Sequence, residues 1–507
     1  MPQYLSPGVY IDEVQAGSRP IEGVGTAVAA FVGLAASGPV NKPTLVTNWT
    51  QFQTAFGSFV EDSYLAHAVY GFFNNGGGSC YVVRVGGDGA SPAAQVALPS
   101  ATEEGLNPYQ ITAREEGPPG NEISIEISAP AEGDEDTFDL VVRRGTDEES
   151  FKGVTVKGTD QNVATVVNAG SKLVRIEETG RAAVAKRRPA PGTYTLAGGT
   201  SAAPAQIGTD DYVGDPAART GFGGLEEIDD ITMLAVPDLM AAYQQETIDL
   251  AAVQAVQQAM IDHCARLKDR IAILDAPPGT TPQQVKEWRA SANYDSPFAA
   301  LYWPWIDVFD PVALGNISVP PCGHVAGIWS RNDDTRGVHK APANEVVRGA
   351  LDLETQITRP EHDLLNPDGI NVIRSFPGRG IRIWGARTLS SDSSWRYLNV
   401  RRLFNYIEES IQEGTDWVVF EPNDLDLWQR IRRTVTEFLL RSWRDGALFG
   451  ATPAQAFYVK CDEETNPPEV VNAGQVVVEI GIAPVKPAEF VVFRIAQVAG
   501  GDAQVTE

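Results

Sequence analysis

Two short apolar runs followed by a long amphipathic segment dominate the stretch from Asn366 to Ile411. The runs Ile370–Ile373 and Ile381–Trp384 are rich in β-branched residues, and a Pro/Gly turn separates them. Beyond them, apolar residues recur at helical spacing as far as Glu413. The pattern therefore predicts a strand–turn–strand unit and then a helix. The N-cap candidates for this helix are Ser390, Ser391 and Asp392.

Strand and helix patterns also alternate on both sides of a less regular middle region. Before that region, the expected elements are a strand at Thr26–Gly33, a helix at Ser63–Phe73 and a strand at Cys80–Val85. After it, they are strands at Ile231–Val236, Ile271–Leu274 and Ala299–Val308, with helices at Glu246–Cys264 and Gln283–Ala292. Strands that alternate with helices predict an α/β fold whose sheet has crossover helices.

The middle region, residues 96–206, differs in composition from its flanks. It is rich in Gly, Pro and acidic residues, and its β-patterned runs are short. We therefore expect a mainly β insertion domain whose carboxylates form a solvated face rather than a catalytic pair.

Both ends of the chain carry strand patterns that have no certain partner. At the N-terminus, Val9, Ile11 and Val14 interleave with Tyr10 and polar residues, and a lone strand is not stable in water. Near the C-terminus, strands are expected at Gln475–Ile482 and Glu489–Gln497. The ends are either a frayed terminus and a plain hairpin, or strands that pair with another subunit.

A helix is predicted at Leu425–Trp443, and it carries a basic stripe opposite its apolar face. At 100° per residue, Arg430, Arg433, Arg441 and Arg444 fall together. The stripe is either a solvated face with a Glu437–Arg441 pair or a surface for a negatively charged partner.

A few residues could belong to an enzyme. Asp238 and Asp275 follow predicted strands, where α/β enzymes place catalytic groups, but aspartates are also ordinary caps and turn formers. Cys322 and His324 would share one face of a strand, yet no orienting third group or oxyanion site is evident. The five histidines have no metal-ligand spacing. We expect no catalytic site, no metal and no cofactor, and the hydrolase-like alternative stays open.

Length and charge narrow the class of protein. At 507 residues, several domains are expected, and the net charge of −26 argues against nucleic-acid binding. The first residues lack the pattern of a Sec signal, no apolar run is long enough to cross a membrane, and the four cysteines stand far apart. We expect cytoplasmic synthesis, reduced thiols and no direct membrane insertion.

Three segments resemble the contractile tail sheath family. The longest begins NPDGINVIRSFPGRGIRIWGARTLSSDSSWRYLNVRRLFNYIEESI at Asn366; the others are YLSPGVYIDEV with SRPIEGVGTAVAAFVG near the N-terminus, and KAPANEVVRG at Lys340–Gly349. The resemblance extends from residue 4 to about residue 495 and is weaker between roughly 96 and 206. The N-terminal sequence is most similar to the sheaths of injection systems. The parent particle stays open between a phage tail, a tailocin and an injection system.

The resemblance implies an α/β sheath core with extended N- and C-terminal β arms and an outer insertion. The implied regions are an N-terminal arm (1–25), a first core part (26–95), the insertion (96–206), a middle core (207–375), a C-terminal sheath domain (376–485) and a C-terminal arm (486–507). The inter-subunit arm residues would be Val9, Tyr10, Ile11, Val14, Phe490, Val491, Val492, Phe493 and Ile495. The strand that accepts arms would contain Val476, Val477, Val478 and Ile480.

The same resemblance implies a structural, non-enzymatic subunit. Copies would polymerise around an inner tube, which Arg430, Arg433, Arg441 and Arg444 would face, and would contract to drive that tube through a target membrane. Further implied partners are baseplate and terminal cap proteins. A non-contractile self-assembling shell shares the arms without needing the arginine face, and stays an alternative.

Overall fold

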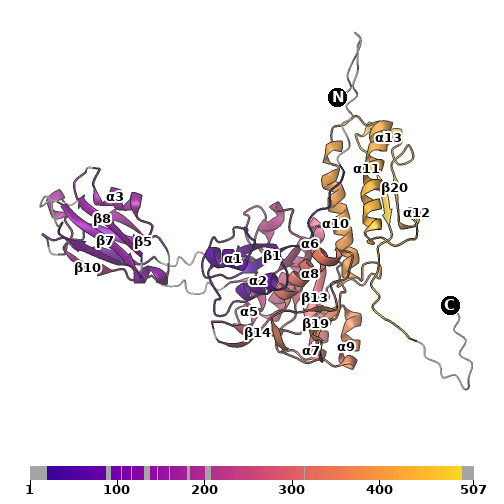
Figure 1. Ribbon diagram of the computed structural model, residues 1–507, viewed down its shortest axis with the longest axis horizontal. Helices are drawn as coiled ribbons and strands as arrows, with labels where there is room; N and C mark the ends of the chain where they lie inside the picture. Colours follow the sequence, from indigo (N-terminus) through magenta and orange to yellow (C-terminus); the bar gives the residue numbers. More distant parts are fainter. Residues whose placement is uncertain are drawn as a thin grey trace, which may run out of the picture. The chain divides into compact units, whose positions relative to one another are not determined.

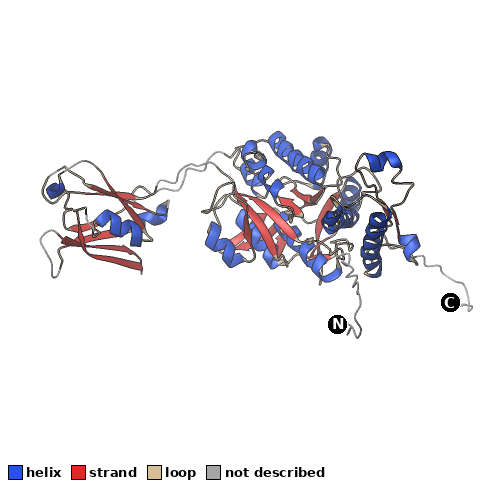
Figure 2. Cartoon of the chain, turned by 90° about the horizontal axis from the view of Figure 1, so that it is seen from above, coloured by secondary structure: helices blue, strands red, loops and turns tan. Residues whose placement is uncertain are grey.

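The chain folds into two compact units (Figures 1 and 2). One is built from the chain up to residue 85 and from residue 208 onward, and the other from residues 86–207. Both contain strands and helices, which confirms the predicted α/β multidomain class. The computed structural model describes residues 20–86, 93–103, 105–115, 117–130, 137–145, 147–158, 160–179, 183–199, 207–312 and 314–493.

A nine-stranded sheet forms the centre of the first unit. Its order is β16-β19-β18-β13-β12-β11-β1-β3-β2, and the six strands from β18 to β3 are parallel. The edge strands β2, β19 and β16 are antiparallel to their neighbours. The strands are β1 (Val28–Gly33), β2 (Thr44–Val46), β3 (Ser79–Arg84), β11 (Met233–Ala235), β12 (Ile271–Asp275), β13 (Ala299–Trp303), β16 (Glu345–Val346), β18 (Ile370–Phe376) and β19 (Gly380–Ile383).

Helices lie on both sides of this sheet (Figure 2). Every residue of β12 and β13 is buried, as expected for parallel strands covered on both faces. The helices are α1 (Trp49–Phe56), α2 (Leu65–Asn74), α4 (Thr209–Val213), α5 (Asp238–Gln244), α6 (Leu250–Leu267), α7 (Pro282–Ala292), α8 (Cys322–Arg336) and α9 (Arg359–Leu365).

Glycines bring α2 and α8 into close contact on one face of the sheet. A Cβ atom at Gly323 would lie 2.3 Å from the carbonyl oxygen of Ala68, and one at Gly327 would lie 2.3 Å from that of Phe72. Only glycine fits at such a backbone-to-backbone approach.

A three-stranded sheet and a helical C-terminal region complete the unit. The sheet has the order β15-β14-β17, with β14 (Ile306–Asp310), β15 (Gly315–Val319) and β17 (Ala350–Leu353). The C-terminal region contains α10 (Leu398–Gly414), α11 (Leu425–Arg444), α12 (Pro453–Ala456), β20 (Phe457–Lys460), α13 (Pro468–Asn472) and β21 (Glu479–Ile482). Helices α10 and α11 lie side by side (Figure 1), and the rings of Tyr406 and Phe438 meet with centroids 6.0 Å apart.

The second unit is mainly β. It has two antiparallel sheets with the orders β10-β6-β7-β8 and β4-β5-β9, and they share one apolar core. Its elements are β4 (Gln95–Leu98), β5 (Tyr109–Ala113), β6 (Ser124–Ser128), β7 (Thr137–Arg144), β8 (Asp147–Thr155), α3 (Val163–Gly170), β9 (Val174–Glu178) and β10 (Gly192–Thr195).

Several predicted elements differ from the structure. The single strand expected at Ala299–Val308 is divided into β13 and β14, because Pro304 has no amide hydrogen to continue the ladder. The helix expected after Ser390 begins only at Leu398, whose amide donates to the carbonyl of Ala386 (3.1 Å), since the preceding segment pairs back along the chain. The strand expected at Gln475–Ile482 is confined to β21.

Candidate assembly interface

Helix α11 presents the predicted arginine stripe, and the four guanidinium groups are used differently. Arg433 and Arg444 are exposed, and neither has a hydrogen-bond or ion-pair partner among the described residues. Arg430 lies 3.3 Å from Glu421 and stacks 4.5 Å from the centroid of the Trp417 ring. The fourth, Arg441, donates to a backbone carbonyl of its own chain.

That carbonyl belongs to Ile21, where the N-terminal segment enters the described structure. Ile21 is 1% exposed and packs in the apolar cluster between α10 and α11. Three residues later, the amide of Val24 donates to Ser410 Oγ (3.1 Å) near the end of α10. The predicted arm residues Val9, Tyr10, Ile11 and Val14 lie outside the described residues. The segment that leads to them is therefore fixed on the helix pair from Ile21 onward.

The C-terminal segment also crosses α10, at the opposite end of the helix. Asn399, in the first turn, donates to the carbonyl of Val485 (3.1 Å), and Glu489 then forms an ion pair with Arg387. Beyond Glu489 the chain is apolar and exposed: Phe490, Val491, Val492 and Phe493 are 72, 68, 77 and 84% exposed. No described residue of this stretch belongs to a strand of the single chain, and Ile495 lies outside the described residues.

Strands β20 and β21 pair only with each other among the described strands. The register places Val459 opposite Ile480 and Phe457 opposite Ile482. Of the predicted acceptor residues, Ile480 is in β21, while Val476, Val477 and Val478 precede it in irregular, partly exposed backbone. A two-stranded sheet of this kind has outer edges to which further strands can add.

The strand-end aspartates serve as internal caps. The carboxylate of Asp238 accepts from the amides of Leu34, Tyr64 and Leu65 and from Ser63 Oγ, at the start of α2. It lies beyond the carboxyl ends of the paired strands β1 and β11, whose following connections lead to opposite sides of the sheet. Open α/β sheets bind ligands at such a point, and a helix N-terminus there favours anions. Burial raises its pKa to about 6, although these hydrogen bonds lower it, and its exposure is 0%. The chain therefore fills this anion site with its own side chain.

Asp275 has the same relation to α8. Its Oδ1 accepts from the amide of Cys322 (3.0 Å), and burial raises its pKa to about 7. Cys322 and His324 are two apart in this helix, not in a strand, so they point to nearly opposite sides. Burial raises the pKa of the Cys322 thiol well above its ordinary value and lowers that of His324 to about 4. The prediction that Cys322 and His324 share one face of a strand was therefore wrong.

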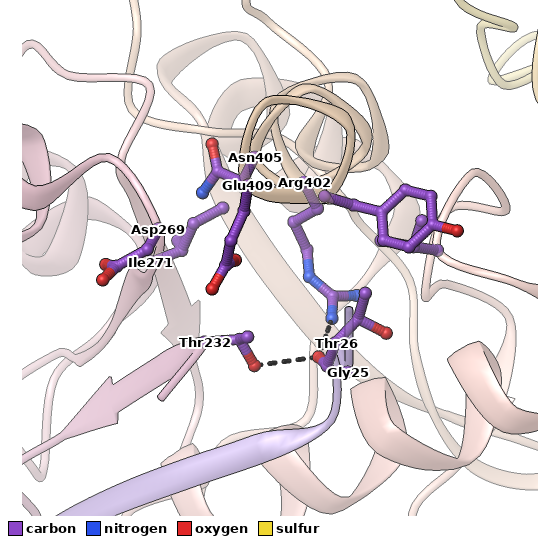
Figure 3. A pocket seen from close by; sticks show the side chains of 10 residues that line it. Gly25, Thr26, Thr232, Asp269, Ile271, Arg402, Asn405 and Glu409 are labelled. Carbon is purple, nitrogen blue, oxygen red and sulfur yellow. Dashed lines mark hydrogen bonds between the residues drawn. The ribbon is translucent and has the colours of Figure 1, made fainter. Parts of the chain in front are cut away.

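A small cavity lies between α10 and the N-terminal ends of the central strands β1, β11 and β12 (Figure 3). Its volume is about 10 Å³, the size of one water molecule. Arg402 reaches across it to the carbonyl of Thr26 (3.0 Å), and Glu409 points toward it (Figure 3). The cavity is too small for a substrate or a cofactor.

The described part of the chain lacks two further features. Its helices include none that is long and apolar enough to cross a membrane. Within the same residues, no group of three or more His, Cys, Asp or Glu side chains could hold a metal ion.

Sequence reasoning missed the residues that hold the two chain ends. At the C-terminal end, Asn399 contacts Val485 across 86 residues and Arg387 contacts Glu489 across 102, and nothing in the local pattern links these residues. One sequence feature could have indicated them. The sheath-like segment that begins at Asn366 contains polar residues, such as Arg387, that the periodicity of a helix or strand does not require.

The described parts of both end segments are thus fixed on α10, and the strand-end aspartates are used as internal caps. Two family models match the chain: the phage tail sheath protein central domain over residues 205–389, and the phage tail sheath C-terminal domain over residues 390–497. Together they cover more than half of the sequence. The chain belongs to the phage tail sheath family.

Curated relatives agree with this assignment. The tail sheath protein of Burkholderia phage BcepMu is 26% identical over 499 residues, which are 93% of this chain and 92% of that protein. The tail sheath protein of Vibrio phage KVP40 is 24% identical over 325 residues, which are 59% of this chain. The chain spans about half the length of the first curated relatives that it matches, 46% for KVP40 and 45% for Salmonella phage ViI.

Solved structures share the fold over nearly the whole chain. The sheath of an extracellular contractile injection system, PVC, in its contracted state has a TM-score of 0.60 and 22% identity, and the match covers 98% of this chain and 99% of that one. The contracted helical sheath of the anti-feeding prophage has a TM-score of 0.59 and 25% identity, with 98% and 100% covered.

Proposed function

We propose that this chain is the structural sheath subunit of a contractile tail or injection system and has no enzymatic role. Copies would be made in the cytoplasm, polymerise as rings or a helix around an inner tube, and end at baseplate and cap proteins. Family membership supports this class, and the observation that carries the assembly mechanism is the apolar segment Phe490–Phe493, which leaves its own subunit exposed.

Strand exchange would join the copies. The proposed donors are residues 9–14 and 490–495, and the proposed acceptor is the β20–β21 sheet of a neighbouring copy, whose outer edges carry no other described strand. Heterologous contacts of this type build rings and helices, and flexible arms allow rigid bodies to change packing without dissociation. Contraction would then release free energy that a kinetically trapped extended state stores.

The enzyme alternative has little support from this geometry. Asp238 and Asp275 are 0 and 4% exposed and cap helices of their own chain, and Cys322 and His324 do not face one another. A non-contractile shell would differ from a sheath only in not needing the arginine face. Variants of Arg433 and Arg444 therefore distinguish the two.

Negative-stain electron microscopy of the chain, expressed with and without its inner tube protein, tests the proposal. We expect regular tubes, which become filled on co-expression. Deleting residues 1–18, or all residues after Glu489, should leave folded protein that forms no long tubes. Normal tubes from both deletions would contradict strand exchange, and monodisperse particles from the intact chain under both conditions would contradict the sheath function.

A further inference from the structure

Three residues of the sheath-like segment that begins at Asn366 donate hydrogen bonds to one carboxylate near the C-terminus, that of Glu489. Arg387 Nε lies 2.8 Å from Glu489 Oε1, and Arg387 Nη2 lies 2.6 Å from Glu489 Oε2. This is the two-point contact that a guanidinium makes with a carboxylate, and it fixes both distance and orientation.

Two further donors complete the contact. Asn366 Nδ2 donates to Oε1 (2.9 Å) and Tyr397 Oη donates to Oε2 (3.3 Å). The side chains of Arg387 and Glu489 are 10 and 20% exposed, so the pair is largely shielded from water. Burial alone would raise the pKa of Glu489, but the hydrogen bonds from Arg387, Asn366 and Tyr397 hold it below its ordinary value.

The arginine is itself held in place by its own neighbourhood. Its amide donates to Asn371 Oδ1 (2.7 Å), Asn371 Nδ2 returns a bond to its carbonyl (2.8 Å), and its Nη1 donates to the carbonyl of Asn366 (3.0 Å). Arg387 is thus positioned without Glu489, as in a preformed binding site.

The chain changes character at this contact. Just before it, Val485 is bonded through its amide to Ala447 (3.2 Å) and through its carbonyl to Asn399 (3.1 Å). Just after it, four apolar residues are at least two-thirds exposed. Glu489 is the last residue that the described contacts tie to the subunit.

We propose that Arg387, Asn366 and Tyr397 form a carboxylate socket whose occupant, Glu489, sets where the rigid subunit ends and the donated C-terminal arm begins. The inference rests on the proposed strand exchange. Its consequence is that the length of free chain, and so the register of residues 490–495 on the neighbouring copy, is determined by this socket and not by the acceptor alone.

Hydrogen exchange on the intact, unassembled chain tests the socket. In Glu489→Gln, which keeps the shape but loses the charge, we expect amide exchange over residues 485–489 to rise at least tenfold, with β20 and β21 unchanged. Arg387→Lys should do the same, because lysine lacks the planar fork. Glu463→Gln, at an exposed carboxylate in the same region, is the matched control and should change nothing.

Tube formation by the same variants completes the test. We expect Glu489→Gln to reduce the number of long tubes at least tenfold, and Glu463→Gln to assemble like the unmodified chain. Unchanged exchange, or faster exchange with normal tubes, would overturn the socket while leaving strand exchange intact. Normal tubes from the chain that ends at Glu489 would instead contradict the C-terminal arm itself.

Discussion

One buried ion pair joins α10 to the α/β body. Arg402 and Asp333 are each 4% exposed through their side chains, with Nη1 and Oδ1 2.9 Å apart. Arg402 also lies over the Trp329 ring, 4.8 Å from its centroid, and Thr26 Oγ1 donates to Asp333 (2.7 Å). Both charged groups therefore have several partners, and removing one of them leaves the other charge without compensation at a buried site.

We therefore predict that Asp333→Asn lowers the free energy of unfolding by about 3 kcal/mol, the usual cost of breaking a buried pair. Urea denaturation of the unassembled chain measures it. Asp368→Asn, which breaks the exposed Lys286–Asp368 pair (3.4 Å), is the control and should cost less than about 1 kcal/mol. Equal losses in the two variants would contradict the prediction.

The carboxyl group of Glu409 makes the stability of this junction depend on pH. Burial, then the nearby Asp269 and Glu413, raise its pKa to about 7, while Arg270 acts in the opposite direction and Asp229 adds to the rise. Because the pKa of Glu409 is higher in the folded chain than in the unfolded chain, protonation of this carboxyl group favours the folded state. This contribution to the free energy of unfolding is fully present below about pH 4.5 and is lost as the pH rises through 7.

Glu409→Gln removes this titration. We expect the variant to be more stable than the unmodified chain at pH 8.5, by on the order of 1 kcal/mol because the site is partly exposed and screened, and equally stable at pH 4.5. Thermal unfolding at the two pH values measures the difference. A constant difference between the two chains at both values would show that Glu409 is not the titrating group.

At the scale of elements, sequence periodicity identified most helices and strands but not their neighbours. The apolar and basic faces of the helix predicted at Leu425–Trp443 follow from 3.6-residue spacing alone, and α11 extends one residue further, to Arg444. Cys322 and His324 were assigned to a strand because three residues carry no period. They lie in α8, whose close packing on α2 at Gly323 is a tertiary contact that the local sequence does not reveal. The Glu489 socket depends on contacts across 92 to 123 residues, which the local pattern of one sequence does not reveal.

The α2–α8 contact gives a prediction that opposes helix propensity. Alanine is favoured over glycine in a helix by about 1 kcal/mol, but a Cβ at Gly323 would lie 2.4 Å from the Cα of Ala68. We expect Gly323→Ala to destabilise the chain by about 2 kcal/mol, as overpacking does in rigid cores. Chemical denaturation measures this.

Gly78 provides the comparison, because a Cβ there would meet nothing within 4 Å. Gly78→Ala should leave the unfolding midpoint unchanged. If Gly323→Ala were equally neutral, the two helices would have to move apart easily, and the close packing would not be a fixed feature of the fold.

At the scale of the whole molecule, the proposed tube-facing surface is a cationic patch on an acidic chain. The net charge of −26 repels other acidic surfaces at long range, while Arg433 and Arg444 are exposed without a described partner. Because Arg430 and Arg441 are engaged with their own chain, the first two should contribute most to binding a negatively charged tube.

We predict that Arg433→Glu with Arg444→Glu leaves the fold intact but abolishes assembly on inner tubes, and that the binding of the unmodified chain weakens as salt is raised. Electron microscopy of co-expressed particles measures the outcome. Arg432→Glu, an exposed arginine on the same helix outside the stripe, is the matched control. Tube-filled particles from the double variant would contradict the tube-facing assignment and favour the shell alternative.

The two chain ends are held at opposite ends of a single helix. Asn399, in the first turn of α10, bonds the C-terminal segment, and Ser410, near its last turn, bonds the N-terminal segment. At 1.5 Å per residue these points are separated by about 16 Å of continuous helix. If both end segments join neighbouring subunits, α10 is the rigid spacer between the two joints of each subunit. The lattice of subunits could then change its angles and its pitch, but the distance between these two joints would stay constant.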